Sequence, residues 1–379
     1  MFKISRLNKS RLANWWWTVD KVTLSIVLTI IFIGAFLVFS ASPSVARTIN
    51  ISDEYHFIKR QIVFIFISIA VIIFFSMQNL KTVRRLAVIG YLGAFALTLA
   101  TLFMGETKGA SRWISIFGIS LQPSEFIKPT FVVMSAWLLD GSKKSEDFPG
   151  TWLSAALFTI TAGVLLLQPD IGMTIVVALI WCFQLFLAGL PLFLLLILAG
   201  IGMIGAVSAY FTFDHFHNRI NAYMSSIFSS GGELPYQIKK SLKAFENGNL
   251  LGKGPGEGVV KNNLPDAHTD FIFAVAGEEF GVVLCTILVV LFSIIVIRSL
   301  ILSTKENNLF IIFTSAGLAA SFGLQGIINM ASSTNLGPTK GMTLPFISYG
   351  GSSLLASAIC IGMLLAVTRK NSAAEDKDI

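Results

Sequence analysis

The residues best suited to chemistry lie in one stretch, LPDAHTDFIFAVAGEEFG, at positions 264–281. Asp270 stands just before an apolar run, and Glu278 and Glu279 lie within that run. A carboxylate at the edge of a membrane span can take a proton from an incoming hydroxyl, as a general base does. Simpler interpretations are that Asp270 caps the following helix and that His268 is an interfacial hydrogen-bonding group. Capping does not explain Glu278, which lies near the helical face of Asp270.

A second polar group lies in SRWISIFGISLQPSEFIKP, at positions 111–129. Its candidates for binding a charged substrate are Arg112, Gln122, Glu125 and Lys128. The planar guanidinium of Arg112 is suited to bidentate binding of an oxyanion such as a diphosphate. Glu125 and Lys128 are three residues apart, so an ion pair at a helix start, with Ser124 as the cap, is the alternative.

Two further motifs place polar residues beside apolar runs. NLGPTKGMTLPFISYGGSS, at positions 335–353, brings Lys340 and Ser348 to the entry of the last span. Irregular backbone at membrane depth is tolerated where it lines a wet cavity, so this segment predicts cavity lining. QPDIG places Asp170 between two apolar runs, where a carboxylate is expected to be paired or to face a cavity. A structural turn is the alternative.

Other patterns disfavour several functional classes. The glycine-rich GNLLGKGPGEG, at positions 248–258, lacks the residue order of a phosphate-binding loop and follows no strand. It predicts a tight turn whose backbone approaches another segment or a ligand. The basic residues are scattered, which disfavours nucleic-acid binding. The three cysteines lie in apolar runs without metal-site spacing.

The composition assigns the chain to the polytopic membrane proteins. Of its 379 residues, 54% are hydrophobic and 13% are charged, and the mean hydropathy is +0.75. Each uncharged run is close to the roughly 20 residues that cross about 30 Å of hydrocarbon. We therefore predict an all-α fold with about ten transmembrane helices. The expected spans are 22–40, 58–77, 86–104, 124–140, 152–168, 171–188, 191–210, 271–297, 308–330 and 346–367.

The distribution of lysine and arginine predicts the orientation in the membrane. With ten spans and the N-terminus inside, the inner segments hold 15 of the 28 basic residues. The outer segments hold 7 once the long loop 211–269 is set aside, so the positive-inside rule places both termini in the cytoplasm. The expected organisation is a cytoplasmic tail (1–21), a transmembrane domain (22–367) and a second cytoplasmic tail (368–379).

The long loop between the seventh and eighth spans, 211–269, is expected to be extracytoplasmic. Within it Ile238, Leu242 and Phe245 follow the i, i+4, i+7 spacing of a short amphipathic helix. Such a helix either lies on the bilayer surface, which suits a protein that handles an anionic lipid, or caps the helical bundle.

Together these segments resemble the SEDS family (shape, elongation, division and sporulation) of polytopic peptidoglycan glycosyltransferases. The resemblance covers nearly the whole chain and rests on ASRWI, LQPSEFIKP, QPDIG, GKGPGEG, LPDAHTDFIFAVAGEEFG and PTKGMTLPFISYGGSS, in family order. PTKGMTLPF is more similar to the cell-division branch than to the elongation branch.

The resemblance implies polymerisation of lipid II, the undecaprenyl-diphosphate-linked disaccharide-pentapeptide, into glycan strands. This reaction is expected on the outer face of the cytoplasmic membrane, at the division septum. The family's essential aspartate falls on Asp270, which we expect to be the general base, and its conserved Glu and Lys fall on Glu125 and Lys128. The expected partners are a class B penicillin-binding protein and other division proteins.

The sequence also predicts which residues bind the substrate. They are Arg112, Gln122, Glu125, Lys128, His268, Glu278, Lys340 and Ser348. No spacing defines a metal site, and a divalent cation such as Mg²⁺ is left open. The alternative functions are a lipid II flippase, an elongation-type polymerase and a scaffold for division partners.

Overall fold

The computed structural model describes residues 10–49, 51–104, 112–116, 119–212, 234–338 and 341–370, with three two-residue pieces between 217 and 224. The helices before the long loop are α1 (Arg11–Thr18), α2 (Lys21–Thr48), α3 (His56–Ser76), α4 (Leu80–Thr101), α5 (Ser124–Lys144), α6 (Gly150–Leu167), α7 (Ile171–Leu187) and α8 (Leu192–Thr212). Those that follow are α10 (Tyr236–Gly248), the 3₁₀ helix η1 (Val260–Asn263), α11 (Ile272–Ser303), α12 (Leu309–Ser333) and α13 (Gly351–Val367). One antiparallel hairpin, β1 (Ile114–Ile116) and β2 (Ile119–Leu121), precedes α5.

Ten of the described helices match the predicted membrane spans in order, and the others are α1, α10 and η1. Seven of them are long and apolar enough to cross a membrane, namely α2, α3, α4, α6, α8, α11 and α12. The shorter apolar helices α7 and α13 and the 21-residue α5, which carries buried charges, complete the set. The prediction of an all-α polytopic membrane protein with about ten spans is therefore confirmed.

The span boundaries are less accurate than the span count. Helix α4 begins at Leu80, although the expected span starts at 86, because Lys81, Arg84 and Arg85 lie in its first turns and hide the start from a search for apolar runs. Helix α2 likewise continues past the expected end to Thr48. Polar residues extend both helices beyond their hydrocarbon-length segments.

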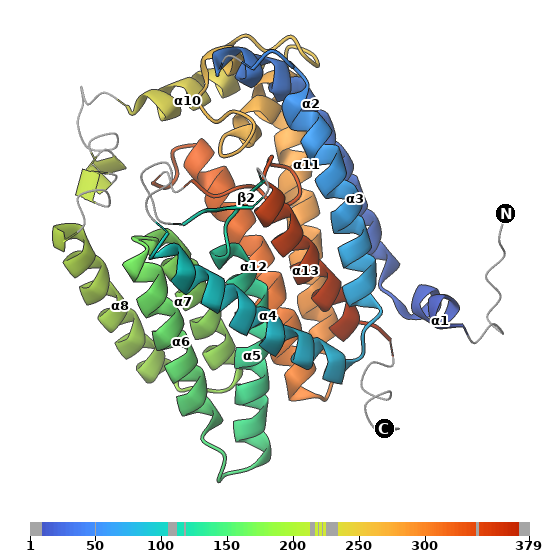
Figure 1. Ribbon diagram of the computed structural model, residues 1–379, viewed down its shortest axis with the longest axis vertical. Coiled ribbons are helices and arrows are strands. Elements are labelled where there is room, and N and C mark those ends of the chain that lie inside the picture. Colours follow the sequence, from blue (N-terminus) through green and yellow to red (C-terminus); the bar gives the residue numbers. More distant parts are fainter. Residues whose placement is uncertain are drawn as a thin grey trace.

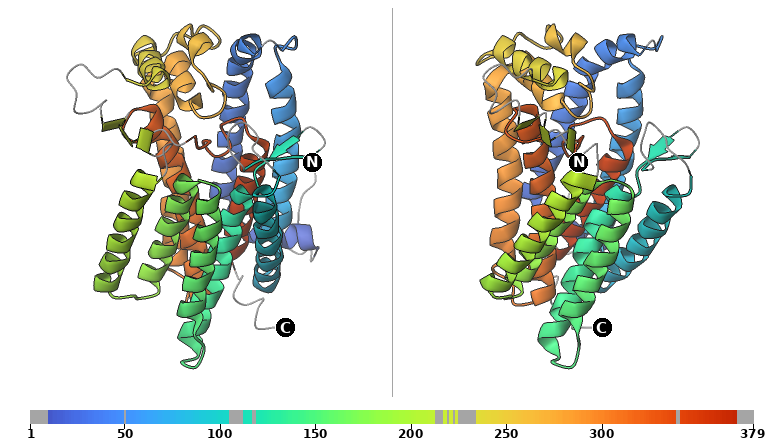
Figure 2. Two further views of the ribbon diagram at one scale, coloured as in Figure 1. Left: turned by 60° about the vertical axis from the view of Figure 1, so that its left-hand side comes forward. Right: turned by 90° about the vertical axis from the view of Figure 1, so that its left-hand side faces the viewer.

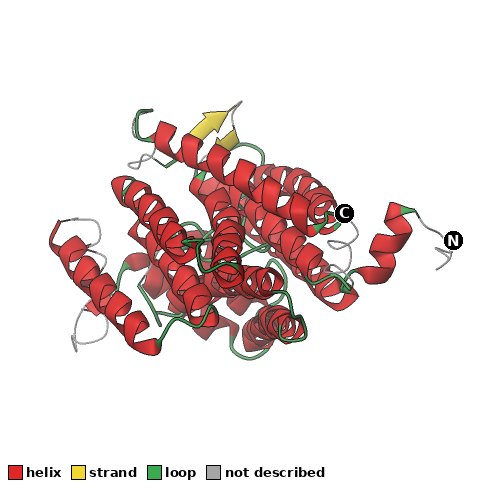
Figure 3. Ribbon diagram, turned by 90° about the horizontal axis from the view of Figure 1, so that it is seen from below, coloured by secondary structure: helices red, strands yellow, loops and turns green. Residues whose placement is uncertain are grey.

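The helices form one bundle around α12, most of which is buried. Helices α5, α7, α11 and α13 contact α12 directly, and the view from below shows the helices gathered into one bundle with the hairpin at its edge (Figure 3). Helix α8 lies at the edge (Figure 2), and Ala209 is its one buried residue. Helix α10 lies across one end of the bundle, whereas α1 lies toward the other (Figure 1). The core and the site thus involve mainly α2, α5, α11, α12 and α13.

Helix α11 is interrupted at Gly281, whose φ of 69° lies in the left-handed region. The interruption exposes backbone groups that would otherwise bond within the helix. The glycine-rich segment after α10 satisfies these groups. The hydrogen bonds run from Lys253 N–H to Glu278 C=O (3.0 Å), Gly254 N–H to Glu279 C=O (3.0 Å), Val282 N–H to Asn249 C=O (3.1 Å) and Val283 N–H to Leu250 C=O (3.3 Å).

Two glycines make this approach possible. A Cβ atom at Gly248 would lie 1.9 Å from the carbonyl oxygen of Gly277, and one at Gly252 would lie 2.1 Å from that of Glu279. Any larger residue would force the two segments apart. The prediction that GNLLGKGPGEG is a tight turn allowing close backbone approach is confirmed, and its neighbour here is α11.

Helix α10 packs on the bundle through the face expected to be apolar. Ile238, Ser241 and Ala244 are buried, and the Ser241 hydroxyl donates to the Ser333 carbonyl of α12 at 2.6 Å. Lys239 is exposed on the outer side. The structure therefore shows the capping arrangement of the two that the sequence allowed.

Candidate active site

Asp270 lies in the turn between η1 and α11. Phe271 is the N-cap residue of α11 and makes no side-chain capping bond, so the interpretation of Asp270 as the helix cap is wrong. The turn continues one residue further than the apolar pattern indicates. Asp270 is half-buried, and its Oδ2 atom lies 3.3 Å from the position that a Cβ on Gly341 would occupy. The carboxylate therefore faces Gly341, in the segment that connects α12 to α13, whose described part 341–350 is called the second loop.

This second loop (341–350) is hydrogen-bonded to the Asp270 turn. The Ser348 hydroxyl donates to the Thr269 carbonyl at 2.5 Å and accepts from the Leu344 amide at 2.8 Å. The Tyr349 amide donates to the His268 carbonyl at 2.8 Å. The sequence predicted that Ser348 binds substrate. In the structure the buried hydroxyl joins the two loops, and its contact with substrate stays a prediction.

Two amide side chains of α12 hold both loops and were missed by the sequence analysis. Asn329 donates to the backbone carbonyls of Asp270 (2.9 Å) and Met342 (2.5 Å). Gln325, four residues earlier and so on the same helical face, donates to the Thr343 carbonyl at 3.1 Å. The available signal was a Gln and an Asn at i, i+4 within an otherwise apolar span.

The predicted ion pair at the start of α5 is confirmed. Lys128 Nζ lies 2.8 Å from Glu125 Oε2, and both side chains are buried. Lys128 also donates to Gln325 Oε1 at 2.6 Å, so the pair is connected to the second loop through Gln325. A cavity of about 10 Å³, roughly the room for one water molecule, adjoins Lys128 and Gln325. Lys128 has two buried acceptors for its three N–H groups, and its direct contact with substrate stays a prediction.

Gln122 and Ser124 lie at the mouth of α5. The Gln122 amide N–H donates to Ser352 Oγ at 2.9 Å, and its half-buried side chain donates to Ser124 Oγ at 3.2 Å. Pro123 is the N-cap residue and no side-chain capping bond forms, so the capping prediction for Ser124 is wrong. Gln122 keeps a partly exposed side chain and stays a candidate for substrate contact.

Arg112 and Asp170 interact with each other and with the α6–α7 turn. Arg112 Nε donates to the Gln168 carbonyl at 2.9 Å, Nη2 donates to the Pro169 carbonyl, and Nη1 lies 3.6 Å from Asp170 Oδ1. Asp170 also caps α7 by accepting from the Met173 amide. The expectation that Asp170 is paired is confirmed. The Arg112 guanidinium binds two carbonyls in this structure, and its contact with the diphosphate stays a prediction.

His268 is buried in an aromatic group. Its ring centroid lies 4.4 Å from that of Phe57 and 5.3 Å from that of Tyr349. Its ring packs against these two aromatic side chains, and its contact with substrate stays a prediction. The exposed side chain of Arg60 lies beside Tyr349, so a cation that the sequence analysis missed adjoins this group.

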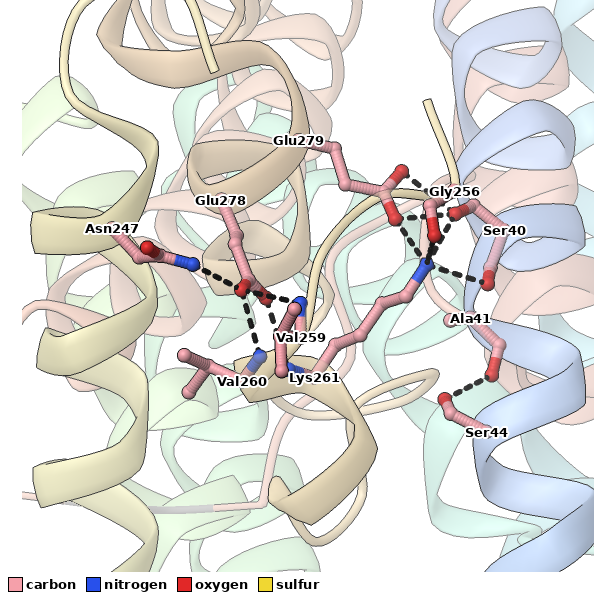
Figure 4. Close-up of polar contacts among 10 residues, drawn as sticks. All are labelled: Ser40, Ala41, Ser44, Asn247, Gly256, Val259, Val260, Lys261, Glu278 and Glu279. Atoms are coloured by element: carbon pink, nitrogen blue, oxygen red, sulfur yellow. Dashed lines mark hydrogen bonds and ion pairs between the residues drawn. The ribbon is translucent and has the colours of Figure 1, made fainter. Parts of the chain in front are cut away.

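Glu278 is fully buried and does not reach the Asp270 side of the turn. Its carboxylate accepts from the Asn247 side chain (2.8 Å) and from the amides of Val259 (2.8 Å), Val260 (2.7 Å) and Lys261 (2.9 Å) (Figure 4). Glu278 therefore anchors η1, and its contact with substrate stays a prediction. Lys340 lies outside the described residues.

Similarity to known proteins extends over nearly the whole chain. The family profile for FtsW, RodA and SpoVE, described as cell cycle protein, matches residues 20–373. The probable peptidoglycan glycosyltransferase FtsW of Caulobacter vibrioides is 40% identical over 371 residues, covering 98% of this chain and 94% of the relative. Its counterpart in Geobacter sulfurreducens is 35% identical over 361 residues, covering 93% and 95%.

Solved structures share the fold. A chain from a peptidoglycan synthase complex that coordinates polymerization and crosslinking superposes with a TM-score of 0.74 at 24% identity, covering 93% of this chain and 98% of that one. The rod shape determining protein RodA of Thermus thermophilus gives a TM-score of 0.65 at 26% identity, covering 93% and 97%. The chain belongs to the FtsW, RodA and SpoVE family of cell cycle proteins.

Proposed function

We propose that the protein is a peptidoglycan glycosyltransferase of cell division that polymerises lipid II, with Asp270 as the general base. One observation carries the assignment of the base. Asp270 is half-buried where two irregular loops meet, whereas Glu125, Glu278 and Glu279 nearby are buried in ion pairs or hydrogen-bonded sites. The relatives named as probable peptidoglycan glycosyltransferases FtsW support the reaction class.

The reaction requires the acceptor 4-hydroxyl to attack C1 of the donor sugar. Asp270 takes the hydroxyl proton as the new C1–O bond forms, and the bond from C1 to the lipid diphosphate breaks with the electron pair leaving on the diphosphate. A positioned base is worth about 10²–10⁴-fold in rate. The Asn329 side chain donates to the Asp270 carbonyl and so holds the backbone of the proposed base.

The departing diphosphate gains negative charge and requires cationic or hydrogen-bonding groups, an electrostatic contribution that is often the largest in catalysis. We propose Lys340 and Gln122 for this contact. Lys128, which is paired with Glu125, binds Gln325, and Gln325 in turn binds the second loop. The ion pair thus supports this contact indirectly.

We propose a class B penicillin-binding protein and other division proteins as partners, and the septal cytoplasmic membrane, with cytoplasmic termini, as the location. The fold shared with a chain of a peptidoglycan synthase complex supports the first. A fluorescent fusion at midcell is the expected result, and even labelling of the side wall would favour the elongation-type alternative.

A divalent cation such as Mg²⁺ is proposed only as a companion of the substrate diphosphate. Among the described residues no three His, Cys, Asp or Glu side chains gather into a metal-binding group. Chelation with EDTA and re-addition of Mg²⁺ tests this, and glycan synthesis unchanged by EDTA would contradict it.

The experiment for the function as a whole uses the purified full chain, its penicillin-binding partner and lipid II. Glycan strands separated on a gel are the expected product. Lipid II transfer between leaflets without strand formation would instead support the flippase alternative.

A further inference from the structure

Lys261, in η1, has a buried ammonium group surrounded by acceptors from three segments. Its side chain is 5% exposed and forms an ion pair with Glu279 of α11, which is fully buried. The ammonium also donates to the Ser40 hydroxyl (2.9 Å) and carbonyl (3.1 Å) of α2 and to the Gly256 carbonyl (3.3 Å) (Figure 4). Ser40 in turn donates to Glu279 at 2.5 Å. These contacts connect η1, α11 and α2.

The neighbouring Glu278 binds the backbone of the same segment. Lys261 therefore has its amide bound by Glu278 and its ammonium bound by Glu279. The hydrogen bond from the Lys261 amide to the Glu278 carboxylate joins residues 17 positions apart. Asp270 lies near the middle of the loop that this hydrogen bond closes. The anchor thus fixes both ends of the segment that carries the proposed base.

Helix α2 also supports the second loop of the site. A Cβ atom at Gly34 would lie 2.3 Å from the Phe346 carbonyl oxygen and 2.6 Å from Ile347 Cα, so the second loop lies directly against this glycine. Ser40 is six residues further along α2 and receives Lys261. Helix α2 therefore supports both the second loop and, through Lys261, the segment that carries Asp270.

We propose that Lys261, together with Glu279 and Ser40, is a positioning residue that sets the location of Asp270 relative to the second loop. This inference rests on the proposed glycosyltransferase function and assigns to it residues that do not touch substrate. A displacement of about 1 Å in a catalytic group can cost about 10²-fold in rate. Loss of the anchor should therefore lower kcat while leaving KM nearly unchanged.

The test uses a double variant, Lys261→Met with Glu279→Leu, in the full chain with its partner. Removing Lys261 alone would leave a buried unpaired carboxylate, whereas apolar replacement of both members of a buried ion pair often preserves folding. The expected results are a melting temperature close to wild type, kcat lowered about 10–100-fold and KM within about twofold. Backbone hydrogen exchange in 264–271 should become faster.

The matched control is Lys59→Met, which removes a lysine from an exposed ion pair with Asp53 at the start of α3. It should change neither kcat nor hydrogen exchange in 264–271. A double variant with wild-type kcat and wild-type exchange overturns the proposal. A different outcome is that wild type makes no glycan while the double variant still shows faster exchange in 264–271. This outcome would support the mechanical link and contradict the proposed function.

Discussion

Asp270 and Glu278 lie eight residues apart in one motif, yet their surroundings differ in every respect that matters for chemistry. Glu278 is fully buried, and its carboxylate accepts from one side-chain amide and three backbone amides. Asp270 is half-buried in a turn, and it is its backbone carbonyl that Asn329 binds. The four donors to Glu278 suit an anchoring role, whereas Asp270 lies at the junction of two loops, where we propose that it meets the substrate.

The described cations near the site have internal partners, as Glu278 does. Lys128 and Lys261 are both buried, and each is bound to a glutamate and to further acceptors of the bundle. Arg112 binds the carbonyls of a neighbouring turn. Charge within a membrane protein thus marks polar structure as often as it marks a ligand site, and burial together with partners distinguishes the two.

The largest effect on stability is expected for Glu278→Leu. Four donors would lose their acceptor, each at a cost of about 1–3 kcal/mol. The variant should unfold at a much lower temperature in detergent, whereas Asp270→Asn should melt like wild type. A Glu278→Leu protein that melts normally but has lost affinity for lipid II would restore the substrate-binding interpretation.

A smaller loss is expected for Lys128→Met. Breaking one member of a buried pair costs about 3–5 kcal/mol because the other charge stays buried without a partner. Adding Glu125→Leu to the variant should recover most of the melting temperature. If the single variant were as stable as wild type, the buried ion pair would not support the second loop in the way described.

The smallest of these effects is expected for Asn329→Leu. The carbonyls of Asp270 and Met342 would each lose a donor, at a cost of about 1–3 kcal/mol per carbonyl in the free energy of unfolding. Because the backbone of the proposed base is released, kcat per folded molecule should also fall. Thermal unfolding and steady-state kinetics on one preparation measure both, and an unchanged kcat would remove Asn329 from the site.

Local features of this protein were readable from its sequence. The ten spans follow from runs of apolar residues near membrane length, and the Glu125–Lys128 pair follows from i, i+3 spacing. The close approach at Gly248 and Gly252 follows from the glycine content of one turn. Asp270 was singled out by its position just before an apolar run.

Contacts between distant segments were not readable in this way. Arg112 binds carbonyls 56 and 57 residues away, and the donors to Glu278 lie 17 to 31 residues before it. Spacing along one helix carries no information about such partners. For the same reason Gln325 and Asn329 were missed, although they hold both loops of the site.

The central claim is that Asp270 is the base of glycan polymerisation. The most direct measurement is strand formation from purified lipid II by wild type and Asp270→Asn, each with the penicillin-binding partner and at equal amounts of folded protein. We expect wild type to make glycan strands and Asp270→Asn to lose about 10²–10⁴-fold in rate at an unchanged melting temperature. Strand formation by Asp270→Asn at the wild-type rate would contradict the claim.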